Sequence, residues 1–193
     1  MNILLHTCCA PCLSGSRIMF EEEGLDITAY WFNPNIAPYN EHQRRLHTLQ
    51  RYLYLDPLPF IQEEGYGNLS YMVSILKDLY PDGNVGGLEI MTDEERRRRC
   101  AHCYGIRLFR TAEKAKEMGF SGFSTTMLLS KHQDHEAIRA VCREAADEVG
   151  IDFVYRDLRT RWKDSIRISR ELGLYRQPYC GCIFSEHERF QGG

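Results

Sequence analysis

Long hydrophobic runs are missing from this 193-residue sequence. A helix that spans a bilayer needs about 20 consecutive apolar residues, and the opening segment MNILLHTCCAPC contains far fewer. That segment also has no basic region before its apolar residues and no cleavage site of small residues after them, so it does not resemble a secretion signal. We therefore expect a cytoplasmic protein that makes no contact with the membrane.

Charge of one sign is also scarce. The chain has 24 Lys and Arg against 27 Asp and Glu, a formal net charge of −3. Such a balance gives no overall attraction to nucleic acid, so any contact with RNA needs a local basic patch. Internal repeats, low-complexity tracts and linkers are absent too, and the composition is that of an ordinary globular protein. We expect one domain over residues 1–193.

Short apolar segments alternate with amphipathic ones along the chain. The alternation predicts an α/β fold with a doubly wound, mainly parallel five-stranded sheet, helices on both faces, and the strand order 3-2-1-4-5. Two helix starts carry the residues of a capping box, Asn40 with Gln43 and Thr92 with Glu95. The expected strands cover 2–6, 27–32, 58–61, 120–125 and 151–156, and the expected helices cover 15–24, a segment from 40, 68–80, 92–119, 133–149 and a last one carrying Trp162, Ile166 and Leu172.

The expected position of a site follows from this order. Ligands of doubly wound sheets bind beyond the carboxyl ends of the strands, near the point where the strand order reverses. The first and fourth strands flank that point. Cys8 and Cys9 follow the first strand, and Ser124, Thr125 and Thr126 end the fourth.

Sulfur, in contrast, is abundant, with eight cysteines. In a reducing compartment they are not a disulfide framework, and the clustered ones indicate metal binding or redox chemistry. Cys8, Cys9 and Cys12 fall where the first strand turns into a helix, with Pro11 suited to a first helical turn. A helix N-terminus stabilises thiolates. A buried small hydrophobe is the alternative for one cysteine, but three within five positions argue against it.

Two further pairs follow. Cys100 and Cys103 form a C-x-x-C inside an expected helix, which places both sulfurs on one face and is typical of half a metal site. Cys180 and Cys182 flank a single glycine, a spacing that suits a readily reduced disulfide, two more metal ligands or two exposed thiols. Cys142 lies in an apolar helix stripe, and we expect it outside the site. Seven clustered thiols exceed what one zinc uses and favour iron, although zinc and copper(I) also take soft sulfur ligands.

One basic run, Arg96 to Arg99, leads directly into Cys100. Pairs between Glu94 and Arg98 and between Glu95 and Arg99 would make it a solvated helix face. Contacts with RNA phosphates are the other interpretation. The candidates for RNA binding are Arg96, Arg97, Arg98 and Arg99, with a rim of Arg44, Arg45, Arg51, Tyr39 and Tyr179.

Polar groups near the end of the fourth strand have several interpretations. The segment STTMLLSKHQDH (124–135) holds hydroxyls that suit a phosphate or sugar but are also ordinary helix caps. His132 and His135, three positions apart, are either metal ligands or solvated helix-start residues. We expect His6, in the first strand, to be a hydrogen-bonded core histidine.

HTCCAPC after the first strand, C-x-x-C in the middle and C-G-C near the end together resemble the QueH family of epoxyqueuosine reductases. The resemblance covers nearly the whole chain. It implies reduction of the epoxide of epoxyqueuosine, a hypermodified base at the tRNA wobble position, to queuosine. It also implies an iron–sulfur cofactor and a low-potential electron donor that the sequence does not identify.

The resemblance further implies roles for the seven clustered cysteines. The implied ligands of a 4Fe–4S cluster are Cys8, Cys9, Cys100 and Cys103, and the implied catalytic residues are the redox-active pair Cys180 and Cys182 with Cys12, which would alternatively hold a mononuclear iron together. The proton donor stays open among Asp134, His132, Tyr179 and Asp157.

The architecture also resembles the adenine-nucleotide α-hydrolase superfamily, which includes the PP-loop ATPases. Those enzymes carry a glycine- and serine-rich phosphate loop after the first strand, where this chain has HTCCAPC, so we do not expect ATP cleavage. Two rival functions remain. A zinc-stabilised RNA-binding module predicts one tightly held zinc and no visible colour. A PP-loop-like tRNA sulfur-transfer enzyme predicts nucleotide binding at Ser124–Thr126.

Overall fold

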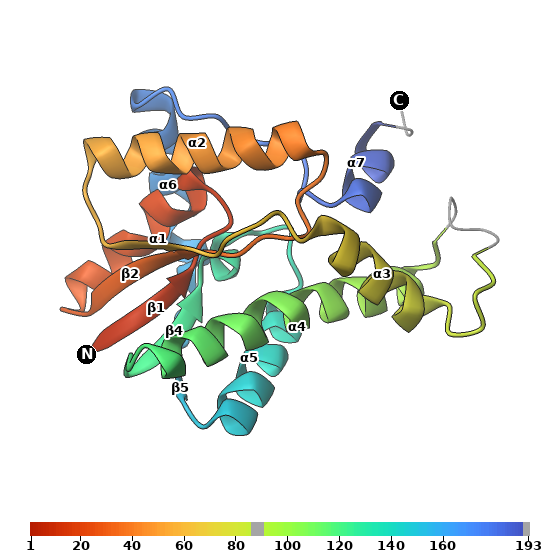
Figure 1. The fold of residues 1–193 in the computed structure, drawn as a ribbon. Helices are drawn as coiled ribbons and strands as arrows, with labels where there is room; N and C mark the ends of the chain where they lie inside the picture. Colours follow the sequence, from red (N-terminus) through yellow and green to blue (C-terminus); the bar gives the residue numbers. More distant parts are fainter. Residues whose placement is uncertain (86–90, 191–193) are drawn as a thin grey trace.

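The computed structural model describes residues 1–85 and 91–190 and contains the predicted five-stranded sheet. Its order is β3-β2-β1-β4-β5, and every pair of neighbouring strands is parallel. The fold class and strand order predicted from the alternation are therefore confirmed. The strands are β1 (Asn2–His6), β2 (Asp26–Trp31), β3 (Phe60–Gln62), β4 (Gly122–Thr125) and β5 (Asp152–Phe153) (Figure 1).

Helices cover both faces of the sheet, as predicted (Figure 1). They are α1 (Ala10–Glu22), α2 (Tyr39–Leu55), α3 (Asn68–Leu79), α4 (Asp93–Glu117), α5 (His135–Val149), α6 (Trp162–Glu171) and α7 (Ile183–Phe190), with the 3-10 turns η1 (Thr126–Leu129) and η2 (Leu158–Arg161). α1 packs against α6 in one layer, and α4 packs against α5 in the other. No described helix combines the length and the apolar composition needed to cross a membrane.

β1 is the central strand and carries the site. Ile3, Leu4 and Leu5 are fully buried, because neighbouring strands flank β1 and helices cover both of its faces. A strand buried on both faces has a continuous apolar run instead of an alternating pattern, which explains the sequence NILLH. Burying one such side chain stabilises the fold by about 1.5–3 kcal/mol. The chain that leaves β1 at Thr7 therefore starts from a fixed position.

The helix after β1 begins earlier than predicted. α1 starts at Ala10, five residues before the expected start at 15, with Cys9 as its N-cap and Pro11 in its first turn. The Cys9 sulfur accepts a hydrogen bond from the Cys12 amide at 3.4 Å. The three cysteines of HTCCAPC thus lie at the junction of β1 and α1, as the pattern predicts.

One capping box is confirmed and the other is wrong. Thr92 caps α4, and the Glu95 carboxylate accepts from the Thr92 amide in return. The predicted box of Asn40 and Gln43 does not form, because α2 begins at Tyr39 with Pro38 as its N-cap. The short helix α7 has no counterpart among the expected elements.

Candidate functional site

Three sulfur atoms converge where β1 ends. The sulfurs of Cys8, Cys9 and Cys12, called here the N-terminal thiols, lie within 4.8 Å of one another. Cys9 is the helix N-cap and Cys12 lies one turn on, so the start of α1 holds both on the same side. The first amides of a helix point beyond its N-terminus and favour negative charge there. The start of α1 thus gathers three thiols that could bind metal.

The three N-terminal thiols shift one another's pKa in opposite directions. Hydrogen bonds from the sulfurs of Cys12 and Cys9 hold the pKa of Cys8 well below its ordinary value. Hydrogen bonding to Cys8 and Cys9, together with burial, raises the pKa of Cys12 well above that value. Thiols bind metals in their deprotonated form, so a metal that binds here would displace the protons that remain on these sulfurs.

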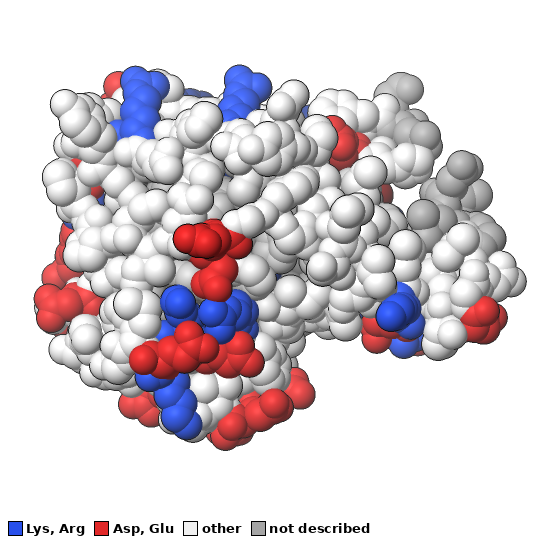
Figure 2. Space-filling model, viewed as in Figure 1, with Lys and Arg blue, Asp and Glu red and all other residues white. Residues whose placement is uncertain are grey.

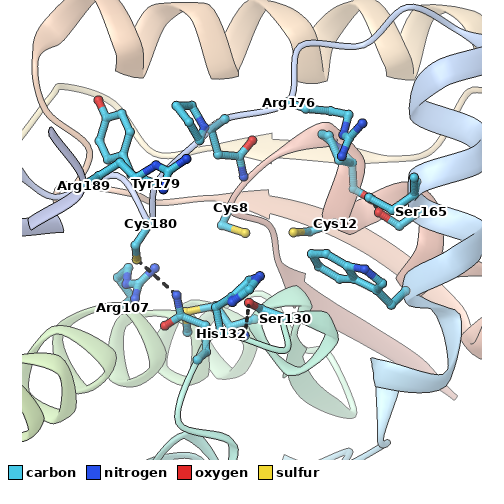
Figure 3. Close-up of a pocket in the computed structure, with 17 residues that line it drawn as sticks. Cys8, Cys12, Arg107, Ser130, His132, Ser165, Arg176, Tyr179, Cys180 and Arg189 are labelled. Atoms are coloured by element: carbon cyan, nitrogen blue, oxygen red, sulfur yellow. Dashed lines mark hydrogen bonds between the residues drawn. The ribbon is translucent and has the colours of Figure 1, made fainter. Parts of the chain in front are cut away.

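A cavity of about 760 Å³ opens beside these sulfurs. Cys8 lines it from the turn after β1, Cys12 from the first turn of α1, and Cys180 from the C-terminal loop (Figure 3). The remaining lining residues, most of them not predicted from the sequence, are Pro11, Arg107, Met127, Ser130, His132, Gln133, Trp162, Ser165, Ile166, Arg176, Gln177, Pro178, Tyr179 and Arg189. Glutamines reach sulfurs in this region, since the Gln133 amide nitrogen lies 3.2 Å from the Cys180 sulfur and that of Gln177 lies 3.1 Å from the Cys9 sulfur.

The loop that carries Cys180 and Cys182 is held by a buried arginine. Arg45 is 1% exposed, pairs with Glu41 at 2.6 Å and donates to the Cys180 carbonyl at 2.9 Å. The Ala37 amide donates to the Gly181 carbonyl at 2.8 Å. The prediction that Arg45 belongs to an exposed RNA-binding rim is therefore wrong, because its guanidinium is used inside the protein.

The glycine of C-G-C is required by the backbone. Gly181 has φ of +129°, and a Cβ there would lie 2.9 Å from Nη1 of Arg45. We expect Gly181→Ala to destabilise the protein by about 1–3 kcal/mol, because the arginine is pinned by Glu41 and cannot move aside. Gly173→Ala, at φ of +59° with no atom within 4 Å, is the matched control and should cost less. Urea unfolding measures both; an equal loss would rule out the contact with Arg45 as the cause.

The second pair of cysteines meets the C-terminal loop. Cys103, on α4, packs in a small buried group with Cys182, Tyr71 and Phe184. Burial raises the pKa of Cys100 and Cys103, and the charges of Arg99 and Arg107 respectively oppose that rise. The middle and last motifs are therefore spatial neighbours.

The predicted division of the cysteines among metals stays a prediction. The C-G-C loop reaches both groups, since Cys180 faces the cavity with Cys8 and Cys182 packs with Cys103. Cys142 is fully buried on α5 among apolar residues, as expected.

Arg107 is a buried cation that sequence reasoning missed. It is 2% exposed, and its Nε donates to the Cys103 carbonyl at 3.2 Å. Its Nη2 has no hydrogen-bond partner among the described residues, and the side chain lines the cavity next to Cys180 (Figure 3). A guanidinium keeps its charge when buried, so Arg107 is a buried positive charge. It forms no ion pair with a described carboxylate. It lies four residues after Cys103 on the same helix face, but nothing in the sequence marks that face as buried.

The arginine run divides between surface and interior. Arg99 is 3% exposed, pairs with Glu188 at 3.0 Å and lies 3.8 Å from the Cys100 sulfur, so it serves the interior instead of a solvated face. Arg98 pairs with Asp78, and Arg96 pairs with Asp93 and Glu188. Among the described residues, these pairs replace the expected ones with Glu94 and Glu95. Arg96, Arg97 and Arg98 are exposed and remain candidates for RNA binding.

The hydroxyls at the end of β4 are buried. Ser124, Thr125 and Thr126 have no exposed surface, and the Thr126 hydroxyl accepts from the Cys8 amide at 3.3 Å. His6 is a satisfied core histidine as expected, with ring nitrogens 3.0 Å from the Thr125 hydroxyl and 3.2 Å from the Phe32 carbonyl. Burial, followed by the charge of Arg107, lowers the pKa of His6 to about 4. These buried groups therefore help to fix the segment that follows β1 and carries the N-terminal thiols.

The four proton-donor candidates separate by position. His132 and Tyr179 line the cavity. Asp134 caps α5 through the Ala137 amide, and Asp157 pairs with Arg159 at 2.6 Å; neither lines the cavity. His135 is buried with its ring 3.1 Å from the Tyr155 hydroxyl, which separates it from the cavity residue His132.

The rest of the predicted RNA-binding rim is dispersed. Arg44 lies over the Tyr175 ring at 3.7 Å, and Arg51 donates to backbone carbonyls at the end of α6. Tyr39 is 55% exposed and packs edge-on against Tyr66. None of these three arginine and tyrosine side chains lines the cavity.

Comparison with known proteins finds one family along nearly the whole chain. The family model described as "Epoxyqueuosine reductase QueH" matches residues 3–188. A relative named Epoxyqueuosine reductase QueH from Dehalococcoides mccartyi is 37% identical and is aligned over 98% of this chain and 94% of its own. One of the same name from Thermotoga maritima is 31% identical over 97% and 92%. A solved structure, a deacetylase in complex with teicoplanin, covers 86% of both chains at 11% identity with a TM-score of 0.43.

Proposed function

This chain belongs to the QueH family of epoxyqueuosine reductases, and we propose that it reduces the epoxide of epoxyqueuosine in tRNA to give queuosine. The observation that carries the proposal is the cavity beside the N-terminal thiols, into which Cys180 also faces. Removal of the epoxide oxygen to leave an alkene consumes two electrons and two protons, and the oxygen leaves as water. An oxidoreductase site thus needs an electron source and a proton donor at one cavity.

We further propose that the clustered cysteines hold a 4Fe–4S cluster and a second, mononuclear iron. The donor set fits such groups, since soft thiolates select iron–sulfur, zinc or copper(I) centres and there are more thiols here than one zinc uses. The proposed ligands of the cluster are Cys8, Cys9, Cys100 and Cys103, and those of the second iron are Cys12, Cys180 and Cys182. When bound, these groups supply electrons taken from a low-potential donor.

The buried cations support an anionic centre at this place. Arg107 has an unpartnered Nη2 in the cavity wall, and Arg99 has an unpartnered Nε beside Cys100. An unpaired buried charge costs several kcal/mol, so Arg107 is stabilised when negative charge occupies the site, whereas Arg99 already pairs with Glu188 and gains a second anionic partner. Thiolates and the groups that they ligate are the negative species that this chain offers there.

The chain itself positions the substrate and supplies the proton. His132 and Tyr179 are the two proton-donor candidates on the cavity wall. The Tyr179 hydroxyl donates to the Ala37 carbonyl at 2.9 Å, and burial raises the pKa of Tyr179. His132 is exposed and lies edge-on to Trp162 with ring centroids 6.0 Å apart. We therefore assign the proton transfer to His132, because an exposed imidazole on the cavity wall can reach a substrate there and imidazole is the commonest general acid of enzymes.

Metal content and substrate conversion test the proposal together. Protein purified without oxygen should contain about four or five irons and about four acid-labile sulfides and absorb broadly in the visible region. With a low-potential reductant it should convert epoxyqueuosine in tRNA to queuosine, detected by mass spectrometry of the digested RNA. Zinc alone in a colourless protein, with no conversion, would support the zinc-stabilised RNA-binding module instead.

A further inference from the structure

The cavity carries positive charge, although the chain as a whole is acidic. Arg107, Arg176 and Arg189 line it, and no Asp or Glu is among its described lining residues. The whole chain has 27 acidic residues and a net charge of −3. A cavity that excludes carboxylates in such a chain attracts an anionic ligand.

Two of these arginines are exposed and free of carboxylates. Arg176 and Arg189 are exposed and form no ion pair with any described residue. Elsewhere basic side chains lie beside acidic ones, as around α4 (Figure 2), where Arg110 pairs with Glu63 at 2.7 Å. Arg176 precedes the C-G-C loop and Arg189 lies on α7 after it. In Figure 3 both lie on the same side of the cavity, across Cys8 and Cys12 from His132.

An aromatic wall faces the same space. Trp162 opens α6 and lines the cavity with His132 edge-on to its ring. Aromatic side chains beside exposed arginines are the combination that binds unpaired nucleotides, because the rings stack on bases and the guanidinium groups contact phosphates. Enzymes that act on a base take it out of its stack into such a pocket.

We propose that Arg176 and Arg189 bind the phosphates that flank the target nucleotide, and that Trp162 stacks on its base beside Cys8 and Cys12. The proposal rests on the proposed function, since it takes tRNA as the substrate. It places the local basic patch that RNA binding needs at the cavity mouth instead of at the run Arg96–Arg99. The sequence does not reveal the patch, because Arg176 and Arg189 lie on either side of the C-G-C loop and only the fold brings both to the cavity.

Binding of an anticodon stem-loop with and without epoxyqueuosine tests the arginines. We expect the double variant Arg176→Gln/Arg189→Gln to weaken binding and to reduce the slope of log K against log salt by about 1.4, or about 0.7 for each phosphate that an arginine no longer neutralises. The matched control, Arg143→Gln/Arg170→Gln, removes two exposed arginines outside the cavity and should leave the affinity within about twofold. Fluorescence anisotropy over a salt series measures both.

Trp162 is tested by separating stacking from packing. Trp162→Leu keeps an apolar side chain but cannot stack, and should weaken binding roughly 5- to 100-fold. Trp162→Tyr keeps an aromatic ring and should restore most of the affinity. If Trp162→Tyr weakened binding as much as Trp162→Leu, the stacking role would be overturned, because a stacking contact should tolerate replacement by a second aromatic ring.

These measurements separate the inference from the proposed function. An unchanged salt slope in the double variant, with reduction of epoxyqueuosine intact, overturns the inference alone. If the wild-type chain reduces no epoxyqueuosine and the double variant still lowers the salt slope, the RNA-binding inference is supported and the proposed reductase function is overturned. A loss of binding in Arg97→Gln but not in the double variant would assign the RNA contact to the arginine run, and failure of the wild-type chain to bind the stem-loop would overturn the inference.

Discussion

Replacement of Cys9 by Ser removes the visible colour and the reductase activity together. A hydroxyl is a poor ligand for the soft metals that thiolates hold, and the thiols of Cys8 and Cys12 lie within 4.8 Å of the altered position. The fold is preserved, because Cys9 is the N-cap of α1 and Ser is among the best N-cap residues. We therefore expect iron content to fall with no loss in the free energy of unfolding of the metal-free protein.

The same loss is expected from Cys103→Ser, in the second motif. The matched control is Cys142→Ala, which removes a fully buried thiol on α5 outside the site and should keep both colour and activity. Iron analysis, the visible spectrum and conversion of epoxyqueuosine in tRNA measure the three variants side by side. Full activity in a colourless Cys9→Ser protein would refute the role of the metal centre.

The sheet and the location of the site were predictable because both depend on local patterns. NILLH is apolar throughout since β1 is buried on both faces, and the order of parallel strands fixes which loops meet at their carboxyl ends. Cys8 and Cys9 therefore had to lie at that end. The predicted capping box of Thr92 and Glu95 is confirmed for the same reason, since its two partners lie within one helical turn of each other.

The failures involve partners far apart in the chain. α2 begins at Tyr39, ahead of Asn40, because Ala37, the residue before its N-cap, is held by the C-G-C loop through the Gly181 carbonyl and the Tyr179 hydroxyl. No pattern around 37–43 contains that information.

The arginines show the same limit. Arg45 binds the Cys180 carbonyl 135 residues away, and Arg99 pairs with Glu188 across 89 residues. In sequence a buried arginine is indistinguishable from a surface one, since its burial depends on whether a distant anion or carbonyl meets it. Arg107 lies in an ordinary amphipathic helix and was missed for that reason.

Arg107→Met changes metal retention and stability in opposite directions. In the metal-free protein Arg107 is a buried cation whose Nη2 lacks a partner, so replacement by an apolar side chain of similar length leaves stability equal or higher. In the loaded protein the same change removes positive charge from a cavity wall that includes Cys8 and Cys180. We expect iron content to fall and the reduction potential of the centre to become more negative, because a nearby cation stabilises the reduced state.

Two variants decide whether the effect is electrostatic. Arg107→Lys keeps the charge while losing the hydrogen bond from Nε to the Cys103 carbonyl, and should restore most of the iron content and the potential. Arg110→Met, one turn along α4, removes an arginine that pairs with Glu63 outside the cavity, and should leave both unchanged. Iron analysis, redox titration and urea unfolding of the metal-free proteins supply the readouts. A purely structural arginine would lower stability and iron content together in Arg107→Met, whereas a countercharge to the thiolates lowers the iron content alone.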